Sequence, residues 1–255
     1  MAKSAQKGGD SLGDRMKGYE DVTRNKLMRR NPVIIRLDGK AFHTWTKGLD
    51  RPHDDTFIAI MANVMKFVCD NVQGAVFAYC QSDEISILLR DYDTLTTEAW
   101  FDNNIQKMVS VSASLATAAF NKYAGEAFDD KPLAFFDSRV FSIPKDDVVN
   151  YFIWRQQDAV RNSIRAVATH YLGHKKCHGK NNSEVQDMLM AMDVPVNWND
   201  LPIHKKRGMC YNSTSKKVDP LIPVFSAMRD YVDFYLEKQP DPEPIEEQTE
   251  EEVNV

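Results

Sequence analysis

Cysteine is scarce in this chain, and long apolar runs are absent. The 255 residues hold four cysteines (Cys69, Cys80, Cys177 and Cys210), and no two of them have CxxC spacing. We therefore expect reduced thiols rather than a disulfide framework. No apolar run approaches the length of a membrane span, and the N-terminal MAKSAQKGGDSLGDR lacks the apolar segment of a secretory signal. These absences favour a cytoplasmic protein with no membrane partner.

The body of the chain also has little net charge of either sign. The formal charge of −5 arises in residues 237–255, which hold eight acidic residues and one lysine, whereas the rest holds 31 basic and 29 acidic residues. The overall sign therefore does not exclude a nucleic-acid partner. Because the Pro/Glu-rich tail has little apolar surface to bury, we expect it to be disordered.

What the chain does have is 43% apolar residues, enough for a real core, in a pattern that predicts alternating strands and helices. The expected elements are, in order, a strand at 33–37, a helix at 54–69, strands at 76–79 and 85–89, a helix at 100–123 and a strand at 133–143. This βαββαβ order is typical of the α+β, ferredoxin-like fold, in which two helices back four antiparallel strands. The first strand is then a neighbour of the hairpin.

Beyond Pro144 the pattern predicts helices at 146–171 and around 185–192. We divide the chain into four regions accordingly: a polar, basic N-terminal arm (1–30), a catalytic core (31–144), a helical and basic C-terminal region packed on that core (145–236), and the acidic tail (237–255).

Carboxylates stand at the ends of two predicted neighbouring strands. Asp38 ends the first strand, and Asp83 and Glu84 lie at the bend of the hairpin. Each pair of letters, DG or DE, is common turn chemistry on its own. Together they form a cluster whose mutual repulsion favours bound Mg²⁺, and two such ions support phosphoryl transfer. The N–H groups of residues 39–43, together with Lys40, are predicted to cradle a triphosphate.

Four fragments in order, RLDGKAFHTW, AYCQSDEISILL, FDSRVF and WRQQDAVRNSI, resemble the family of tRNA-His guanylyltransferases and their Thg1-like relatives, which polymerise in the 3′ to 5′ direction. The resemblance covers about residues 17–212. It implies a polymerase-type palm that adds nucleotides to the 5′ end of tRNA, after activation of a 5′-monophosphate by ATP or GTP. It also implies two Mg²⁺ ions and a homotetramer.

Carried over by position, the resemblance assigns roles to the strand-end residues. Asp38 and Asp83 become metal ligands with the Gly39 carbonyl, and Glu84 supports the metal site as a catalytic residue. The nucleotide pocket is assigned, besides Asp38, Gly39 and Asp83, to Lys40, Ala41, Phe42, His43 and Ser82.

The long C-terminal helix carries a polar stripe with Arg155, Gln156, Asp158, Arg161 and Asn162, which helical spacing places close to one face. Such a stripe is ordinarily solvated, but the resemblance favours nucleotide contacts for Arg155, Asp158 and Asn162 and an RNA contact for Arg161. After Asp158 the chain has Val160 where eukaryotic members have histidine. This resembles the Thg1-like branch, which repairs truncated tRNA 5′ ends by templated addition.

Basic residues farther along suit phosphate contacts with RNA. The run HYLGHKKCHGKNN has spacings that zinc tolerates but matches no standard zinc signature. We assign tRNA or 5′-end contacts, partly from the resemblance, to Lys175, Lys176, Lys180, Asn181, Lys205 and Arg207.

Two rival functions use a similar fold. A non-catalytic RNA-binding module usually displays aromatic residues on its central strands, where this chain has acids. A nucleotide cyclase on the same palm needs the metal carboxylates and triphosphate loop but has no need of the basic C-terminal region.

Overall fold

The computed structural model describes residues 11–125 and 127–238. A six-stranded antiparallel sheet with the order β4-β1-β3-β2-β5-β6 forms its centre. The strands are β1 (Val33–Gly39), β2 (Ala75–Gln81), β3 (Glu84–Leu89), β4 (Phe136–Ser142), β5 (Met209–Asn212) and β6 (Lys217–Asp219). The first four follow the predicted order along the chain, and β1 lies beside β3 of the hairpin as expected. The short strands β5 and β6, which extend the sheet beyond β2, were not predicted.

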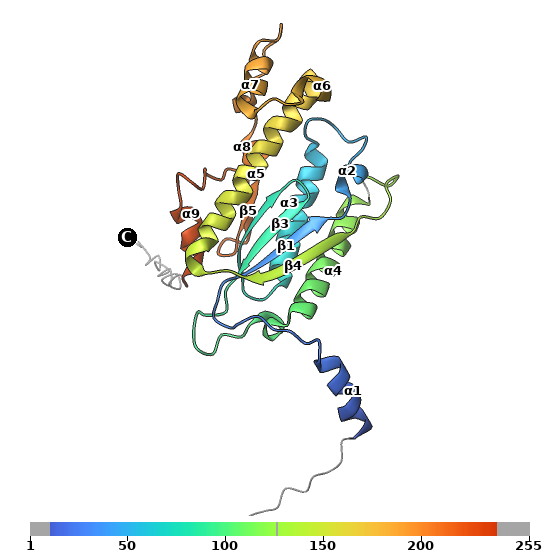
Figure 1. The fold of residues 1–255 in the computed structure, drawn as a ribbon, viewed down its shortest axis with the longest axis vertical. Helices are drawn as coiled ribbons and strands as arrows, with labels where there is room; N and C mark the ends of the chain where they lie inside the picture. The colour runs from blue at the N-terminus through green and yellow to red at the C-terminus, as the bar shows by residue number, and fades with distance from the viewer. Residues whose placement is uncertain (1–10, 126, 239–255) are drawn as a thin grey trace, which may run out of the picture.

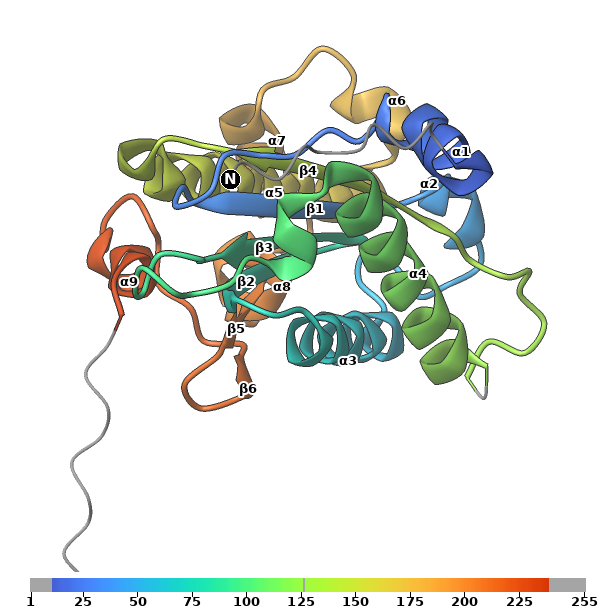
Figure 2. The same ribbon diagram turned by 90° about the horizontal axis from the view of Figure 1, so that it is seen from below.

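Helices cover both faces of this sheet (Figures 1 and 2). On one face α3 (Asp55–Asn71) and α4 (Ile105–Ala124) pack against alternate strand residues such as Ile35 and Ile87. On the other face lies α5 (Lys145–Leu172). Its N-terminal half, called here the inner half, packs against Ile34, Phe77 and Leu88. Because side chains alternate along a strand, the residues that face α5 include the polar ones near the strand ends.

The remaining elements are short. They are α1 (Leu12–Asp21), α2 (Phe42–Trp45), η1 (Trp100–Asn103), α6 (His174–Cys177), α7 (Asn182–Met190), η2 (Trp198–Asp200), α8 (Ile203–Arg207), α9 (Asp230–Asp233) and η3 (Phe234–Leu236). Figure 1 shows α6 and α7 beyond the outer end of α5, and α1 extending from the opposite end of the molecule. None of the described helices is long and apolar enough to cross a membrane.

Several predicted boundaries were wrong. The helix expected from residue 100 begins at Ile105, because Phe101, Asp102 and Asn103 have positive φ values. The strand expected from 133 begins at Phe136. The arm, residues 1–30, contains a helix that was not predicted. Residues 1–10 of the arm and 239–255 of the acidic tail lie outside the described residues.

Candidate active site

The ends of β1 and β3 bring the predicted carboxylates together. Asp38 is paired with Glu84 in the β1–β3 ladder, and the Gly39 N–H donates to the Asp83 carbonyl at 3.2 Å. Their neighbours Leu37 and Ile85 point into the α3/α4 core, so by alternation Asp38 and Glu84 face α5. The structure thus places Asp38, Asp83 and Glu84 together at one end of the sheet, beneath the middle of α5.

Glu84 is buried and held by two arginines. Arg155 donates to it twice, from Nε to Oε1 at 2.7 Å and from Nη2 to Oε2 at 3.0 Å, and Arg36 Nη2 donates to Oε2 at 2.5 Å. Burial raises the pKa of Glu84, and the two guanidinium groups act against that rise. With both oxygens occupied, Glu84 joins α5 to the sheet and stands behind the site.

Asp38 and Asp83 are much less constrained. The Ser82 hydroxyl donates to Asp83 at 2.9 Å, and the ion pair of Asp38 with Arg139 is long, at 3.7 Å. Burial and the nearby Asp38 carboxylate raise the pKa of Asp83. Repulsion of this kind is relieved by a cation.

The predicted Mg²⁺ requires a suitable set of donor atoms near Asp38 and Asp83. Within residues 11–125 and 127–238 no three His, Cys, Asp or Glu side chains are grouped to hold a metal. The predicted set is instead two carboxylates, Asp38 and Asp83, with the Gly39 carbonyl. Hard oxygen donors with one or two carboxylates suit Mg²⁺, which keeps several waters and binds substrate phosphates. The residues present therefore fit such an ion.

The loop after β1 offers fewer free N–H groups than expected. The Gly39 N–H is bonded to Asp83, and the Lys40 N–H donates to the Phe135 carbonyl at 2.8 Å. Ala41 then takes the left-handed conformation (φ 57°) and starts α2. The N–H groups of residues 41–43 make no hydrogen bond to another described residue, and the side chains of Lys40 and His43 are exposed. The predicted triphosphate cradle is thus reduced to the start of α2.

Phe42 was predicted to line the nucleotide pocket, but its side chain does not face one. Its ring is 2% exposed and packs among aromatic rings of the core, including those of Trp45 and Phe120. Trp45 is likewise buried and does not face a base. A Cβ on Gly39 would lie 2.3 Å from the Phe42 ring. The glycine is therefore required for packing, because only its bare backbone leaves room for the ring.

We predict that Gly39→Ala lowers the free energy of unfolding by about 1–3 kcal/mol, because the locked Phe42 ring cannot move away from the new methyl group. Urea unfolding measures the change. Gly18→Ala is the matched control, since no atom lies within 4 Å of a Cβ built there, and it should leave the core unaffected. Equal stability of wild type and Gly39→Ala would contradict the packing role.

The polar stripe of α5 forms a hydrogen-bonded network next to the carboxylates. Asp158 accepts bonds from Arg155 at 2.9 Å, Arg161 at 2.8 Å and Asn162 at 3.4 Å. Arg155 is 4% exposed and also stacks on Trp154. The prediction that Arg155 contacts the nucleotide is therefore wrong. The Arg155 guanidinium instead donates to Glu84 and Asp158. Gln156 points elsewhere, to Pro223 and Phe225.

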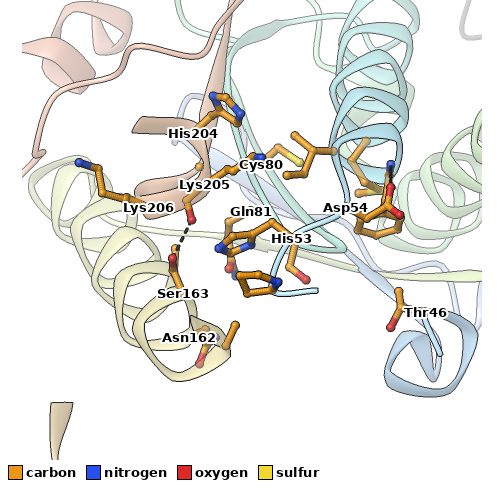
Figure 3. A pocket seen from close by; sticks show the side chains of 18 of the residues that line it. Thr46, His53, Asp54, Cys80, Gln81, Asn162, Ser163, His204, Lys205 and Lys206 are labelled. Carbon is orange, nitrogen blue, oxygen red and sulfur yellow. Dashed lines mark hydrogen bonds between the residues drawn. The ribbon is translucent and has the colours of Figure 1, made fainter. Parts of the chain in front are cut away.

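A cavity of about 240 Å³ opens beside the strand ends (Figure 3). Of the predicted nucleotide residues, Ser82 and Asn162 line it. His53 and His204 line it as well, and neither was predicted. Burial lowers the pKa of His53 to about 4, so the ring is neutral at physiological pH, and its buried Nε2 has no hydrogen-bond partner among the described residues.

Lys205 lies in the cavity wall, apart from the other predicted RNA contacts, and pairs with Asp55 at 2.6 Å. Its helix α8 is held beside the sheet by Gly208, where φ is 81° and a Cβ would meet the Cys80 carbonyl at 2.5 Å. Arg207 is partly buried, and its carbonyl accepts a bond from Tyr79. Lys205 therefore lies in the wall of the large cavity, and Arg207 lies against the sheet.

The other predicted RNA contacts lie at the outer end of α5. Lys175 and Lys176 are exposed on α6, and Lys180 pairs with Glu184. Asn181 caps α7, and its side-chain oxygen accepts from the Glu184 N–H. The residue is exposed, and its predicted contact with the tRNA 5′ end stays a prediction. From Asp158, α5 continues for fourteen residues to Leu172, or about 21 Å, and α6 begins beyond the non-helical Gly173. The structure does not bring this group to the carboxylates.

Two arginines at the site were missed. Arg36 lies two residues before Asp38 on the same face of β1, and Arg139 on β4 lies between Asp38 and Asp137, 3.6 Å from the latter. The period of two along a strand was the available signal. His53 had no comparable signal, because it lies in an irregular loop.

A sheet end with clustered carboxylates, beside a cavity lined by both polar and apolar side chains, is the arrangement expected of an enzyme that handles nucleotides. The chain belongs to the Thg1 family, since the family model described as tRNAHis guanylyltransferase matches residues 13–144. This confirms the resemblance seen in the sequence, and the family is one of nucleotidyltransferases.

Solved structures agree. A bacterial Thg1-like protein in complex with ATP is 50% identical, with a TM-score of 0.86 over 89% of this chain and 99% of that one. A bacterial Thg1-like protein in complex with GTP is 45% identical, with a TM-score of 0.75 over the same shares. An uncharacterised protein of Acanthamoeba polyphaga mimivirus is 26% identical over 235 residues, 82% of this chain and 80% of that protein.

Proposed function

We propose that this protein is a Mg²⁺-dependent tRNA nucleotidyltransferase that adds nucleotides to the 5′ end of tRNA in the 3′ to 5′ direction. The observation that carries the proposal is the meeting of Asp38 and Asp83 at adjoining strand ends, next to the cavity that Ser82 and Asn162 line. The bacterial relatives in complex with ATP and with GTP support nucleoside triphosphates as substrates.

The proposed reaction has two steps. First, an oxygen of the tRNA 5′-monophosphate attacks the α-phosphorus of ATP or GTP, and pyrophosphate leaves. Second, the 3′-hydroxyl of an incoming nucleoside triphosphate loses its proton and attacks the activated 5′ phosphorus, so that a phosphodiester forms and the nucleoside monophosphate leaves. A 5′-triphosphate end needs only the second step, with pyrophosphate as the leaving group.

Each group of residues has a part in this scheme. Asp38, Asp83 and the Gly39 carbonyl hold Mg²⁺, which when bound stabilises the attacking and leaving oxygens. The exposed side chains of Lys40 and His43 and the N–H groups at the start of α2 contact the triphosphate. The large cavity takes the nucleoside, with Asn162 at its edge.

Two further parts of the proposal come from the resemblance. They are templated repair of truncated tRNA in addition to guanylate addition on tRNA-His, and assembly into a homotetramer. We also propose a cytoplasmic location.

A 5′-end extension assay tests the proposed function. The purified protein is incubated with Mg²⁺, ATP and all four nucleotides, and with 5′-labelled tRNA-His lacking its −1 residue or another tRNA shortened by one 5′ nucleotide. Growth on both substrates supports templated repair, and growth only on tRNA-His restricts the function to guanylate addition. No growth on either, with or without a 5′-triphosphate, would overturn the proposal.

We predict that replacing Lys175 and Lys176 by Ala weakens tRNA binding mainly at moderate salt. Each lysine–phosphate interaction removed should reduce the slope of log K against log salt by about 1, so the double variant should reduce it by about 2. Filter binding across a salt titration measures it. Lys122→Ala with Lys217→Ala, which removes the same charge from sites elsewhere on the surface, is the control. If the two double variants showed the same salt dependence of tRNA binding, Lys175 and Lys176 on α6 would make no RNA contact.

A further inference from the structure

A second, smaller cavity shares a wall with the nucleotide cavity. It has a volume of about 120 Å³, and Pro52, His53 and Lys205 line both cavities. Figure 3 shows His53 and Lys205 on the wall of the larger one. The wall that it shares with the cavity proposed for the nucleoside distinguishes it from a packing gap elsewhere in the molecule. We call it the side cavity.

The rest of the side cavity is apolar and aromatic. Val167 and Tyr171 come from the outer half of α5, and Trp198 and Leu201 come from the segment that precedes α8. The Trp198 ring is fixed, since its Nε1 donates to the Ser163 hydroxyl at 3.0 Å, and the Lys206 ammonium lies 5.7 Å from the ring centroid. Tyr171 is 46% exposed, so its ring is accessible to a ligand.

This lining suits a planar, polar-edged ring better than a phosphate. Lys205, a cation of the lining, is already paired with Asp55 at 2.6 Å, which leaves it little capacity for an anion. His53 in the shared wall is neutral, and its buried Nε2 lacks a partner among the described residues. Aromatic and apolar walls with one unmatched polar atom are the features that hold an unstacked nucleobase.

We propose that the side cavity binds one unstacked nucleobase of the RNA substrate, from the unpaired strand opposite the 5′ end that grows. In a templated addition, the incoming nucleotide pairs with one base of that strand. The next base of the strand stays unpaired and must leave the reaction centre. A cavity separated from the nucleotide cavity by one wall is placed to receive that base. This inference rests on the proposed function.

The test compares Tyr171→Ala with Tyr171→Phe, which keeps the ring. The probe is an RNA hairpin carrying the tRNA acceptor stem with its 3′ overhang, and the same hairpin made blunt. Stacking predicts that Tyr171→Ala raises the Kd for the overhang hairpin about tenfold, with unchanged Kd values for the blunt hairpin and for ATP. Tyr171→Phe should match the wild type.

A fluorescent base tests the contact directly. 2-Aminopurine in the 3′ overhang should be quenched by wild type and by Tyr171→Phe, and not by Tyr171→Ala. Val196→Phe, which fills the side cavity from another side, should reproduce the loss if Tyr171→Ala fails to fold.

Three outcomes for Tyr171→Ala would overturn the inference. They are an equal rise in Kd for both hairpins, no change in any Kd, and a rise in the Kd for ATP alone. The last would assign the cavity to a free nucleotide. If wild type extends tRNA while Tyr171→Ala binds the overhang normally, only this inference fails. If wild type neither binds nor extends tRNA, the proposed function fails as well.

Discussion

Asp83→Ala is expected to lower nucleotide addition to the tRNA 5′ end by about a thousandfold or more, since a metal that stabilises transition-state charge contributes several kcal/mol. The reason is geometric. Asp83 stands in the turn between β2 and β3, against the end of β1, and with Asp38 it makes up the carboxylates available to a metal. The extension assay measures the loss under single-turnover conditions.

The same change should not harm the fold. Burial and Asp38 raise the pKa of Asp83 in the folded protein. Stability therefore falls as the pH rises from the unfolded pKa of this carboxyl through its folded pKa. At neutral pH without Mg²⁺, Asp83→Ala should therefore unfold at a urea concentration equal to or above that of wild type. Added Mg²⁺ should stabilise wild type and not the variant.

Asp187→Ala is the control, because it removes the same charge from an exposed position on α7. It should keep both activity and the response to Mg²⁺. Undiminished addition by Asp83→Ala would overturn the metal assignment. Loss of activity together with loss of the fold would instead make Asp83 a structural residue.

Arg155→Ala is expected to lower the free energy of unfolding by about 3–5 kcal/mol, because it leaves the buried Glu84 carboxylate with Arg36 as its one remaining partner among the described residues. The urea midpoint reports the change. Arg155→Lys should recover only part of it, since a lysine cannot reproduce the two parallel bonds to Glu84.

The control is Arg161→Ala, which removes another Asp158 partner whose side chain is 53% exposed. Exposed pairs contribute about 0–1 kcal/mol, so this variant should be nearly as stable as wild type. Glu84→Gln, made both in the wild type and in Arg155→Ala, completes a double-mutant cycle. A coupling close to zero between Arg155 and Glu84 would show that the buried pair does not hold α5 to the sheet.

The sequence was sufficient to predict that Asp38, Asp83 and Glu84 meet. Apolar runs that stop on carboxylates give both the strands and their ends, and the βαββαβ order makes β1 a neighbour of the hairpin. It was not sufficient to separate their roles. Glu84 is distinguished from Asp83 by Arg36 and Arg155, and the pairing with Arg155 depends on how a helix 71 residues away lies across the sheet.

Local patterns also failed where one residue has two possible uses. Phe42 follows a predicted triphosphate loop, and nothing in the sequence shows that Ala41 takes a left-handed conformation that turns the ring inward. Asn181 lies among lysines that suit RNA, but an asparagine three residues before Glu184 is also a capping box. β5 has four residues, too few for a visible alternation.

The long helix α5 divides into two parts with different surroundings. Its inner half packs on the sheet through Phe152 and is clamped by Arg155, whereas its outer half shares a small separate cluster with Cys177, Val185 and Leu189. Elements with fewer buried contacts open at lower free energy and form their own cooperative unit. Amide protons beyond residue 164 should therefore exchange with solvent before those of the inner half, while the carboxylates stay fixed.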